Sequence, residues 1–140
     1  MDSDAQQNFD MMRDLRQAMA KNELELYFQP KIDAKSGKVT AAEALLRWQH
    51  PKHGLVMPGS FIPLAERTGL IVTLGRWVLE NACRQAADWQ HRYGAGAPAK
   101  VSINVSARQL AEPDFVGTVD EILARRGVDR SRLVLEITET

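Results

Sequence analysis

Segments that read as strands alternate with helical segments in the second half of the chain, and this alternation is the strongest constraint on the fold. Val101 to Val105 and Leu133 to Ile137 are short apolar runs of the kind found in strands buried on both faces. Helical spacing precedes each run, from about Thr73 to Tyr93 and from Asp114 to Arg126. Ser106 to Gln109 forms a capping-box pattern directly after the first run. Strands separated by helical crossovers predict a parallel sheet in an α/β architecture.

The first half of the chain has a different pattern. Leu24 to Ile32 alternates apolar and polar residues, and a short turn joins it to a second strand-like segment, Val39 to Trp48. The short connection predicts an antiparallel hairpin. Asn8 to Ala20 has the apolar spacing of an amphipathic helix. We therefore interpret residues 1–20 as a helix or linker that leads into a domain at residues 21–140.

The segment from His50 to Gly59 is rich in Pro and Gly and reads as a loop. After it, Ser60 is the expected N-cap of a short helix, and Thr73 is the expected N-cap of the long one. His50 and His53 have a spacing that also occurs in metal sites. Because histidines in loops are usually solvated, we interpret this pair as exposed.

The composition excludes several classes of function. The chain has 140 residues, of which 44% are hydrophobic, and its 18 basic and 18 acidic residues cancel. No net field would draw it to a nucleic acid polymer or an anionic membrane. The N-terminus is polar and no apolar run has the length of a membrane span. Cys83, the single cysteine, reads as a buried thiol in a reducing compartment. We therefore expect a cytoplasmic domain without membrane contact from this segment.

Three polar residues, Glu43, Asn104 and Glu136, interrupt the apolar strand-like runs. Such side chains are costly to bury unless something binds them. Two carboxylates and an amide oxygen that meet from neighbouring strands would suit a hard cation such as Mg²⁺ or Mn²⁺. Arg47 shares a face with Glu43 and could clamp a phosphate. Taken singly, each residue is better explained by an ordinary charged pair or an internal hydrogen bond. The three together, on three predicted strands, favour a shared site, although spacing alone does not show that they converge.

Several short motifs surround these residues in a fixed order. Glu43-Ala44-Leu45 forms the central tripeptide. The others are Tyr27-Phe28-Gln29-Pro30, Pro58-Gly59-Ser60-Phe61-Ile62-Pro63-Leu64-Ala65-Glu66, Ser102-Ile103-Asn104-Val105-Ser106 and Leu135-Glu136-Ile137-Thr138-Glu139-Thr140. From about Leu15 to Thr140 the chain resembles the EAL domain family, the cyclic di-GMP phosphodiesterases of bacterial signalling.

The resemblance implies a TIM-like (β/α) barrel whose first strand is antiparallel to the rest. A complete barrel of this kind needs about 250 residues, so we expect a form truncated to roughly the first half. The family hydrolyses cyclic di-GMP to linear diguanylate in a reaction that depends on two Mg²⁺ or Mn²⁺ ions. The implied roles are metal ligation and catalysis by Glu43, Asn104 and Glu136; substrate binding by Gln29, Glu43, Leu45 and Arg47; and stabilisation of a loop by Glu139.

Residues that the family uses for its second metal and for water activation would follow Thr140. We therefore expect the parent protein to be a phosphodiesterase and the isolated chain to be inactive. A non-catalytic cyclic di-GMP receptor and a protein-interaction module stay open as alternatives. An upstream sensor or GGDEF-type domain is a further candidate partner. Because half a barrel leaves an apolar strand edge unpaired, we also expect self-association.

Overall fold

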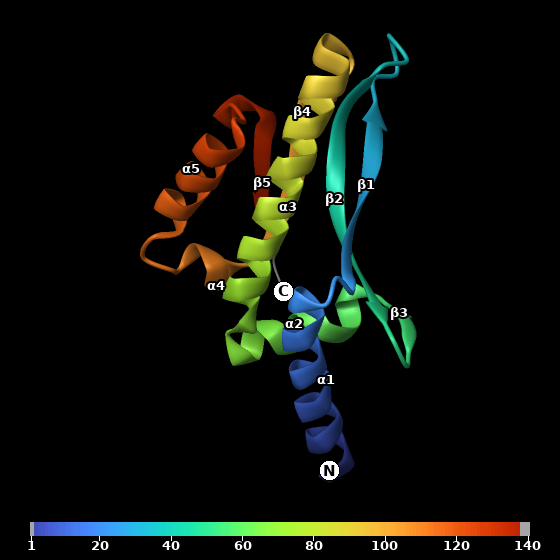
Figure 1. Cartoon of the computed structure of the whole chain (residues 1–140), viewed down its shortest axis with the longest axis vertical. Helices are drawn as coiled ribbons and strands as arrows, with labels where there is room; N and C mark the ends of the chain where they lie inside the picture. Colours follow the sequence, from blue (N-terminus) through green and yellow to red (C-terminus); the bar gives the residue numbers. More distant parts are fainter. Residues whose placement is uncertain (1, 138–140) are drawn as a thin grey trace.

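The structure is a computed structural model that describes residues 2–137, with side chains described from Asp4 onward. Strands and helices alternate along it (Figure 1). The strands are β1 (Leu24–Ile32), β2 (Val39–His50), β3 (Gly54–Val56), β4 (Lys100–Val105) and β5 (Leu133–Ile137). The helices are α1 (Asp2–Ala20), α2 (Pro58–Thr68), α3 (Leu70–Tyr93), α4 (Ala107–Leu110) and α5 (Phe115–Arg126), with 3₁₀ turns η1 (Gly94–Gly96) and η2 (Arg130–Arg132).

The strands form one mixed sheet with the order β1-β2-β4-β5, and the short β3 pairs with the end of β2. β1 is antiparallel to β2, whereas β4 is parallel to β2 and β5 is parallel to β4. The sheet does not close on itself, so β1 and β5 are its edges. This arrangement confirms the predicted α/β fold with an antiparallel first strand.

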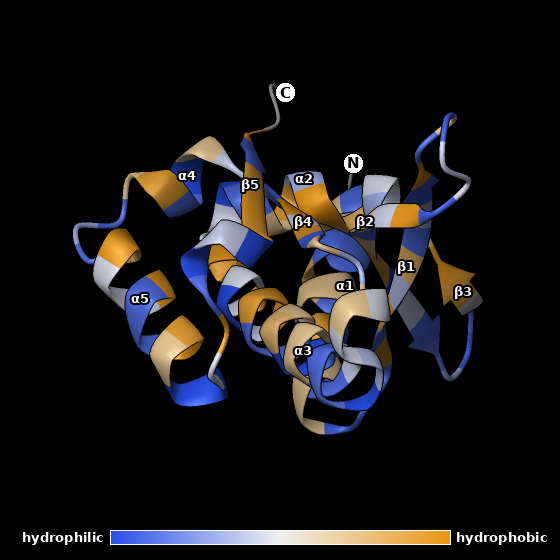
Figure 2. Cartoon of the chain, turned by 90° about the horizontal axis from the view of Figure 1, so that it is seen from above, coloured by the Kyte–Doolittle hydropathy of each residue, from blue (hydrophilic) through white to orange (hydrophobic). Residues whose placement is uncertain are grey.

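One face of the sheet is covered by α3 and α5 (Figure 2). Val101, Ile103 and Val105 of β4 are at most 2% exposed and pack against apolar residues of these helices. We call this group the sheet cluster; its buried members are Ala44, Leu79, Ala82, Cys83, Ala86, Val101, Ile103, Val105, Val119, Ile122, Leu123 and Val128. Successive side chains of a strand point to opposite faces. Ser102 and Asn104 therefore lie on the face away from α3 and α5.

A second buried group joins α1 and α2 to the far end of β2. Leu15, Trp48 and Phe61 are fully buried in it, and the rings of Trp48 and Phe61 meet edge to face with centroids 5.4 Å apart. The indole Nε1 of Trp48 donates a hydrogen bond to Glu23. We call this group the Trp48 cluster; its buried members are Met12, Leu15, Ala18, Leu24, Trp48, Phe61, Leu64, Ala65, Ile71 and Leu74. The C-terminal half of α1 is thus part of the folded core.

The helix starts differ from those predicted. α2 begins at Pro58 with Met57 as its N-cap, not at Ser60, because proline fits the first helical position and needs no N–H partner there. α3 begins at Leu70 rather than Thr73. Gly69 has a left-handed φ of 86°, so it ends α2 and starts α3 in a single residue. The strand β3 was predicted as loop, and α1 extends back to Asp2.

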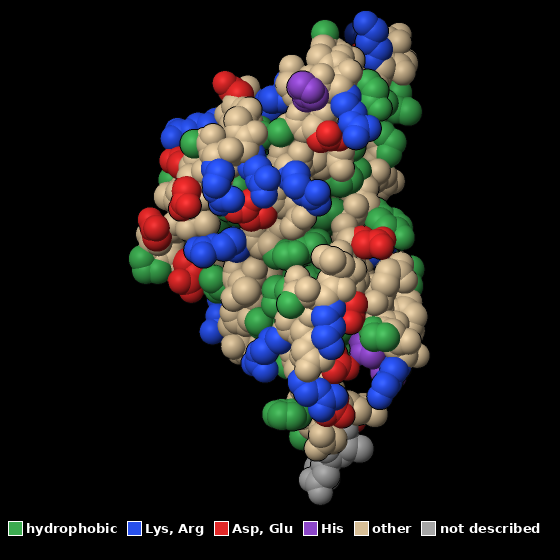
Figure 3. Space-filling model, viewed as in Figure 1, with side chains coloured by type: hydrophobic (Ala, Val, Ile, Leu, Met, Phe, Trp, Pro, Cys, Tyr) green, Lys and Arg blue, Asp and Glu red, His purple; other side chains and the backbone are tan. Residues whose placement is uncertain are grey.

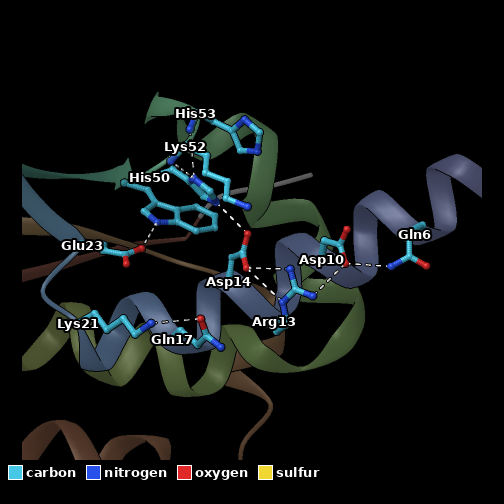
Figure 4. A network of polar contacts seen from close by, with 11 residues as sticks. Gln6, Asp10, Arg13, Asp14, Gln17, Lys21, Glu23, His50, Lys52 and His53 are labelled. Carbon is cyan, nitrogen blue, oxygen red and sulfur yellow. Dashed lines mark hydrogen bonds and ion pairs between the residues drawn. The ribbon is translucent and has the colours of Figure 1, made fainter.

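The interpretation of His50 as a solvated loop residue was wrong, whereas His53 is exposed as expected. His50 is the last residue of β2 and is only 7% exposed. Its Nδ1 accepts hydrogen bonds from the backbone N–H groups of Lys52 and His53. Its Nε2 lies 2.9 Å from a carboxylate oxygen of Asp14 on α1, as Figure 4 shows. In the neutral ring Nε2 therefore carries the hydrogen and donates a hydrogen bond to the Asp14 carboxylate.

This contact predicts a change in the acid stability of the chain. The hydrogen bond from His50 is the main cause that lowers the pKa of Asp14 below 3.8. A carboxyl whose pKa is lower in the folded than in the unfolded state stabilises the fold at pH values above its unfolded pKa. This stabilisation is lost as the pH falls through the pKa of the folded state. We expect Asp14→Asn to lower the free energy of unfolding at pH 7 by about 1 kcal/mol. The difference in the free energy of unfolding between wild type and Asp14→Asn, measured by urea unfolding, should shrink below pH 3.8.

A matched control for that experiment is Asp10→Asn. Asp10 lies one turn earlier on α1 and contacts only exposed partners, Arg13 and Gln6 (Figure 4). Exposed pairs of this kind contribute little to stability. If the free energies of unfolding of wild type and Asp14→Asn differ by the same amount from pH 7 down to pH 2.5, the assigned role of the Asp14 carboxylate is contradicted.

The outer surface of α3 and α5 is rich in charge (Figure 3). Arg125 and Arg126 of α5 both bind Glu80 of α3, and the hydrogen bond from Arg125 is the main cause that lowers the pKa of Glu80. Beneath them Cys83 is 1% exposed, and burial raises the pKa of its thiol to about 11. The thiol is buried, as the sequence indicated. No helix among residues 2–137 has the length and apolar content needed to cross a membrane.

Candidate metal and substrate site

The face of the sheet away from α3 and α5 carries the predicted site residues. Glu43 of β2 pairs in register with Gln29 of β1 and with Ser102 of β4. Asn104, two residues beyond Ser102, pairs with Glu136 of β5. Register partners on neighbouring strands project to the same side of a sheet. The three proposed ligands and Gln29 therefore share one face across four strands.

The distances on this face join the residues in two pairs. The Asn104 amide nitrogen donates to Glu43 Oε2 over 3.4 Å. The Glu136 carboxylate lies 3.6 Å from the ammonium of Lys31, which comes from β1. Asn104 is exposed, while Glu43 and Glu136 are half-buried. The structure thus brings Glu43 and Asn104 into contact and places Glu136 on the adjacent strand.

Arg47 and Leu45 continue the same face toward the carboxyl end of β2. Leu45 pairs in register with Tyr27 of β1. The Arg47 guanidinium lies 5.6 Å from the centre of the Tyr27 ring, within reach of a cation–π contact. One of its nitrogens donates to the carbonyl oxygen of Leu46. The remaining donors of this guanidinium can serve an anionic ligand.

A cavity of about 350 Å³ lies between β2, the end of β4 and helices α2 and α3. Ala44, Leu45, Leu46 and Asn104 bound it on the strands, and residues of α2 and α3 bound it on the other side. Most of its lining is apolar, and such pockets with a few polar groups are the usual binding places of small molecules. Because Ala44 and Leu46 belong to the helix side of β2, the cavity lies mainly on that side and meets the site face at Leu45 and Asn104.

The turn that follows Asn104 is fixed by buried polar contacts. Ser106 accepts a hydrogen bond from the backbone N–H of Gln109, and the Gln109 side chain accepts one from the backbone N–H of Ser106. This confirms the predicted capping box. Gln109 packs against Gly75 of α3, where an added Cβ would lie 1.7 Å from the Gln109 amide nitrogen. No local pattern indicates this supporting role of Gly75, because the two residues are far apart along the chain.

The donors on this face fit a hard divalent cation. Glu43 and Glu136 supply carboxylate oxygens, Asn104 supplies an amide oxygen, and the buried Ser102 hydroxyl has no hydrogen-bond partner among the described residues. Oxygen donors of these types suit Mg²⁺ or Mn²⁺. Within residues 4–137 no three His, Cys, Asp or Glu side chains lie close enough to hold a metal. A cation site on this face therefore needs the amide oxygen of Asn104 in addition to the two carboxylates. Glu139 lies outside the described residues.

Comparison with known proteins agrees with this geometry. The family model of the EAL domain matches residues 12–140. The bifunctional diguanylate cyclase/cyclic di-GMP phosphodiesterase MucR of Pseudomonas aeruginosa is 46% identical over 140 residues, which are 100% of this chain and 20% of that protein. The cyclic di-GMP phosphodiesterase PA2567 of the same organism is 40% identical over 141 residues, covering 100% of this chain and 24% of its own length.

Solved structures show the same relationship. The structure described as PaMucR phosphodiesterase, c-di-GMP complex, superposes with a TM-score of 0.86 at 46% identity. The match covers 94% of this chain and 52% of that one. The chain therefore spans about half of a solved EAL structure and a quarter or less of these curated relatives, and its open sheet is part of the EAL barrel. On this evidence the chain belongs to the EAL domain family.

Proposed function

We propose that this chain is part of an EAL domain that hydrolyses cyclic di-GMP to linear diguanylate with Mg²⁺ or Mn²⁺. The observation that carries the proposal is the position of Glu43, Asn104 and Glu136 on one face of three adjacent strands. The names of MucR and PA2567 as cyclic di-GMP phosphodiesterases support it. So does the cyclic di-GMP complex of PaMucR.

Each side chain has a role that its position allows. Glu43, Asn104 and Glu136 would hold the cation through oxygen atoms. A bound divalent cation supplies charge stabilisation at the phosphoryl group and lowers the pKa of water. Arg47 would bind a phosphate oxygen, because its planar guanidinium matches that geometry. Gln29 and Leu45, which share the face of Glu43, would contact the rest of the dinucleotide.

The test is an assay of a complete EAL domain that contains residues 12–140. Incubation with cyclic di-GMP and Mg²⁺ should give linear diguanylate, identified by chromatography, and chelation of the metal should stop the reaction. Binding of cyclic di-GMP without turnover would favour the receptor alternative. Neither binding nor turnover would favour an interaction module.

We further propose that residues 21–140 form the N-terminal half of the domain, that residues 1–20 lead into it with Met12, Leu15 and Ala18 already packed in its core, and that this half alone is inactive. The inactivity is supported by the donor set, since residues 4–137 contain no three His, Cys, Asp or Glu side chains placed for a metal. The two carboxylates and the amide would hold one cation, and a two-metal centre would need further ligands.

We also expect the 140-residue chain to self-associate. Within the described residues, β1 and β5 have no neighbouring strand on their outer sides, and Ile32 and Ile137 on them are 62% and 63% exposed. Unpaired edges with apolar side chains tend to pair with another chain. Light scattering after size exclusion should give a mass above 15.7 kDa that rises with concentration. A single 15.7 kDa species at micromolar concentration would contradict this expectation.

A further inference from the structure

Lys31 is a charged residue on the site face that the proposed reaction does not use. It lies on β1 two residues after Gln29, and its ammonium is 3.6 Å from Glu136 Oε1. β1 and β5 are the opposite edges of the strand order β1-β2-β4-β5. The contact therefore passes over β2 and β4. The ammonium of Lys31 lies above the strands that carry Glu43 and Asn104.

This position places a positive charge next to a proposed metal ligand. An ammonium group has three donors and no acceptor, so it can bind a carboxylate but cannot coordinate a cation in this charge state. An oxygen of Glu136 that faces the ammonium is less available to a metal, and two positive charges a few ångströms apart repel each other. The Lys31 and Glu136 side chains are 52% and 39% exposed. A pair this exposed stabilises the fold little and can exchange partners.

We propose that Lys31 competes with the divalent cation for Glu136 and thereby sets the metal affinity of the site. The inference rests on the proposed function, because it takes Glu136 as a metal ligand. In the metal-free chain Lys31 neutralises Glu136. When the cation binds, the ammonium must give up this carboxylate, so the measured metal affinity includes the cost of breaking the pair.

The test measures Mn²⁺ binding to the 140-residue chain by water-proton relaxation, which needs no enzymatic activity. Removing one positive charge a few ångströms from a divalent cation should tighten binding about tenfold in Lys31→Met. Lys35→Met is the matched control: it removes the same charge from the exposed turn of the hairpin and should change the affinity less than about twofold. Equal Mn²⁺ affinities of wild type and Lys31→Met would overturn the proposal. Lys31→Gln repeats the test with a polar side chain if methionine perturbs the hairpin.

A double-mutant cycle tests whether Lys31 acts through Glu136. In a Glu136→Gln background the effect of Lys31→Met should fall below about threefold, because the shared partner is gone. An undiminished tenfold effect would mean that Lys31 acts only through its long-range field and would overturn competition for Glu136.

Glu43→Gln separates this inference from the proposed function. If Glu43→Gln weakens Mn²⁺ binding while Lys31→Met leaves it unchanged, the metal site stands and the role of Lys31 is rejected. If neither wild type nor Lys31→Met binds Mn²⁺, or if Glu43→Gln binds it as well as wild type, the metal site and the competition are rejected together.

Discussion

Replacing Glu43 by glutamine in a complete EAL domain that contains this segment is expected to lower the kcat for cyclic di-GMP hydrolysis by about a thousandfold or more. A loss of this size corresponds to about 4 kcal/mol of transition-state stabilisation. Glutamine keeps the size of the side chain and can still accept a hydrogen bond from Asn104. It lacks the negative charge that a divalent cation requires from its ligand. The measurement is the rate of linear diguanylate formation at saturating Mg²⁺.

Glu121→Gln is the matched control for this experiment. Glu121 is exposed on α5, which covers the opposite face of the sheet from Glu43, and its replacement should change kcat less than about twofold. Circular dichroism of both variants would verify that the fold is kept. Turnover by Glu43→Gln at a rate close to that of wild type would remove Glu43 from the metal site and leave the proposed mechanism without its central ligand.

Trp48→Ala is expected to lower the free energy of unfolding by about 3–5 kcal/mol. The indole is fully buried, packs edge to face on Phe61 and donates a hydrogen bond to Glu23. Its removal leaves a cavity at the junction of α1, α2 and β2. Domains of this size have only about 5–15 kcal/mol of stability in total, so the loss is severe. Urea unfolding followed by circular dichroism measures it.

The control for Trp48→Ala is Tyr93→Ala, another loss of an aromatic ring. Tyr93 is the last residue of α3 and is 60% exposed. Its replacement should cost less than about 1 kcal/mol, because little buried surface is lost. Similar costs for the two variants would show that the Trp48 cluster does not support the fold in the way its packing indicates.

Local patterns in the sequence predicted the arrangement of the site face. Alternation along Leu24 to Ile32 and along Val39 to Trp48 separates the two faces of β1 and β2, and the structure has the same division. The capping box at Ser106 was also predictable, since both of its partners lie within four residues. Such features depend on neighbours in the chain and therefore appear in the sequence.

The features that the sequence did not predict depend on distant partners. β3 has three residues and is a strand only because it pairs with the end of β2. His50 is buried because β2 continues to it and because Asp14 meets it from α1. The contact between Lys31 and Glu136 likewise requires two strands that are separated by most of the chain. Local sequence patterns do not predict these tertiary contacts, because the partners are far apart along the chain.

The long helix α3 belongs to both buried clusters. Near its start it contributes Ile71 and Leu74 to the Trp48 cluster, and farther along it contributes Leu79 and Cys83 to the sheet cluster. One continuous helix thus joins the two buried clusters of residues 4–137. The two clusters cannot melt separately unless this helix breaks in the middle. The Trp48 cluster and the sheet cluster should therefore unfold together in one cooperative transition.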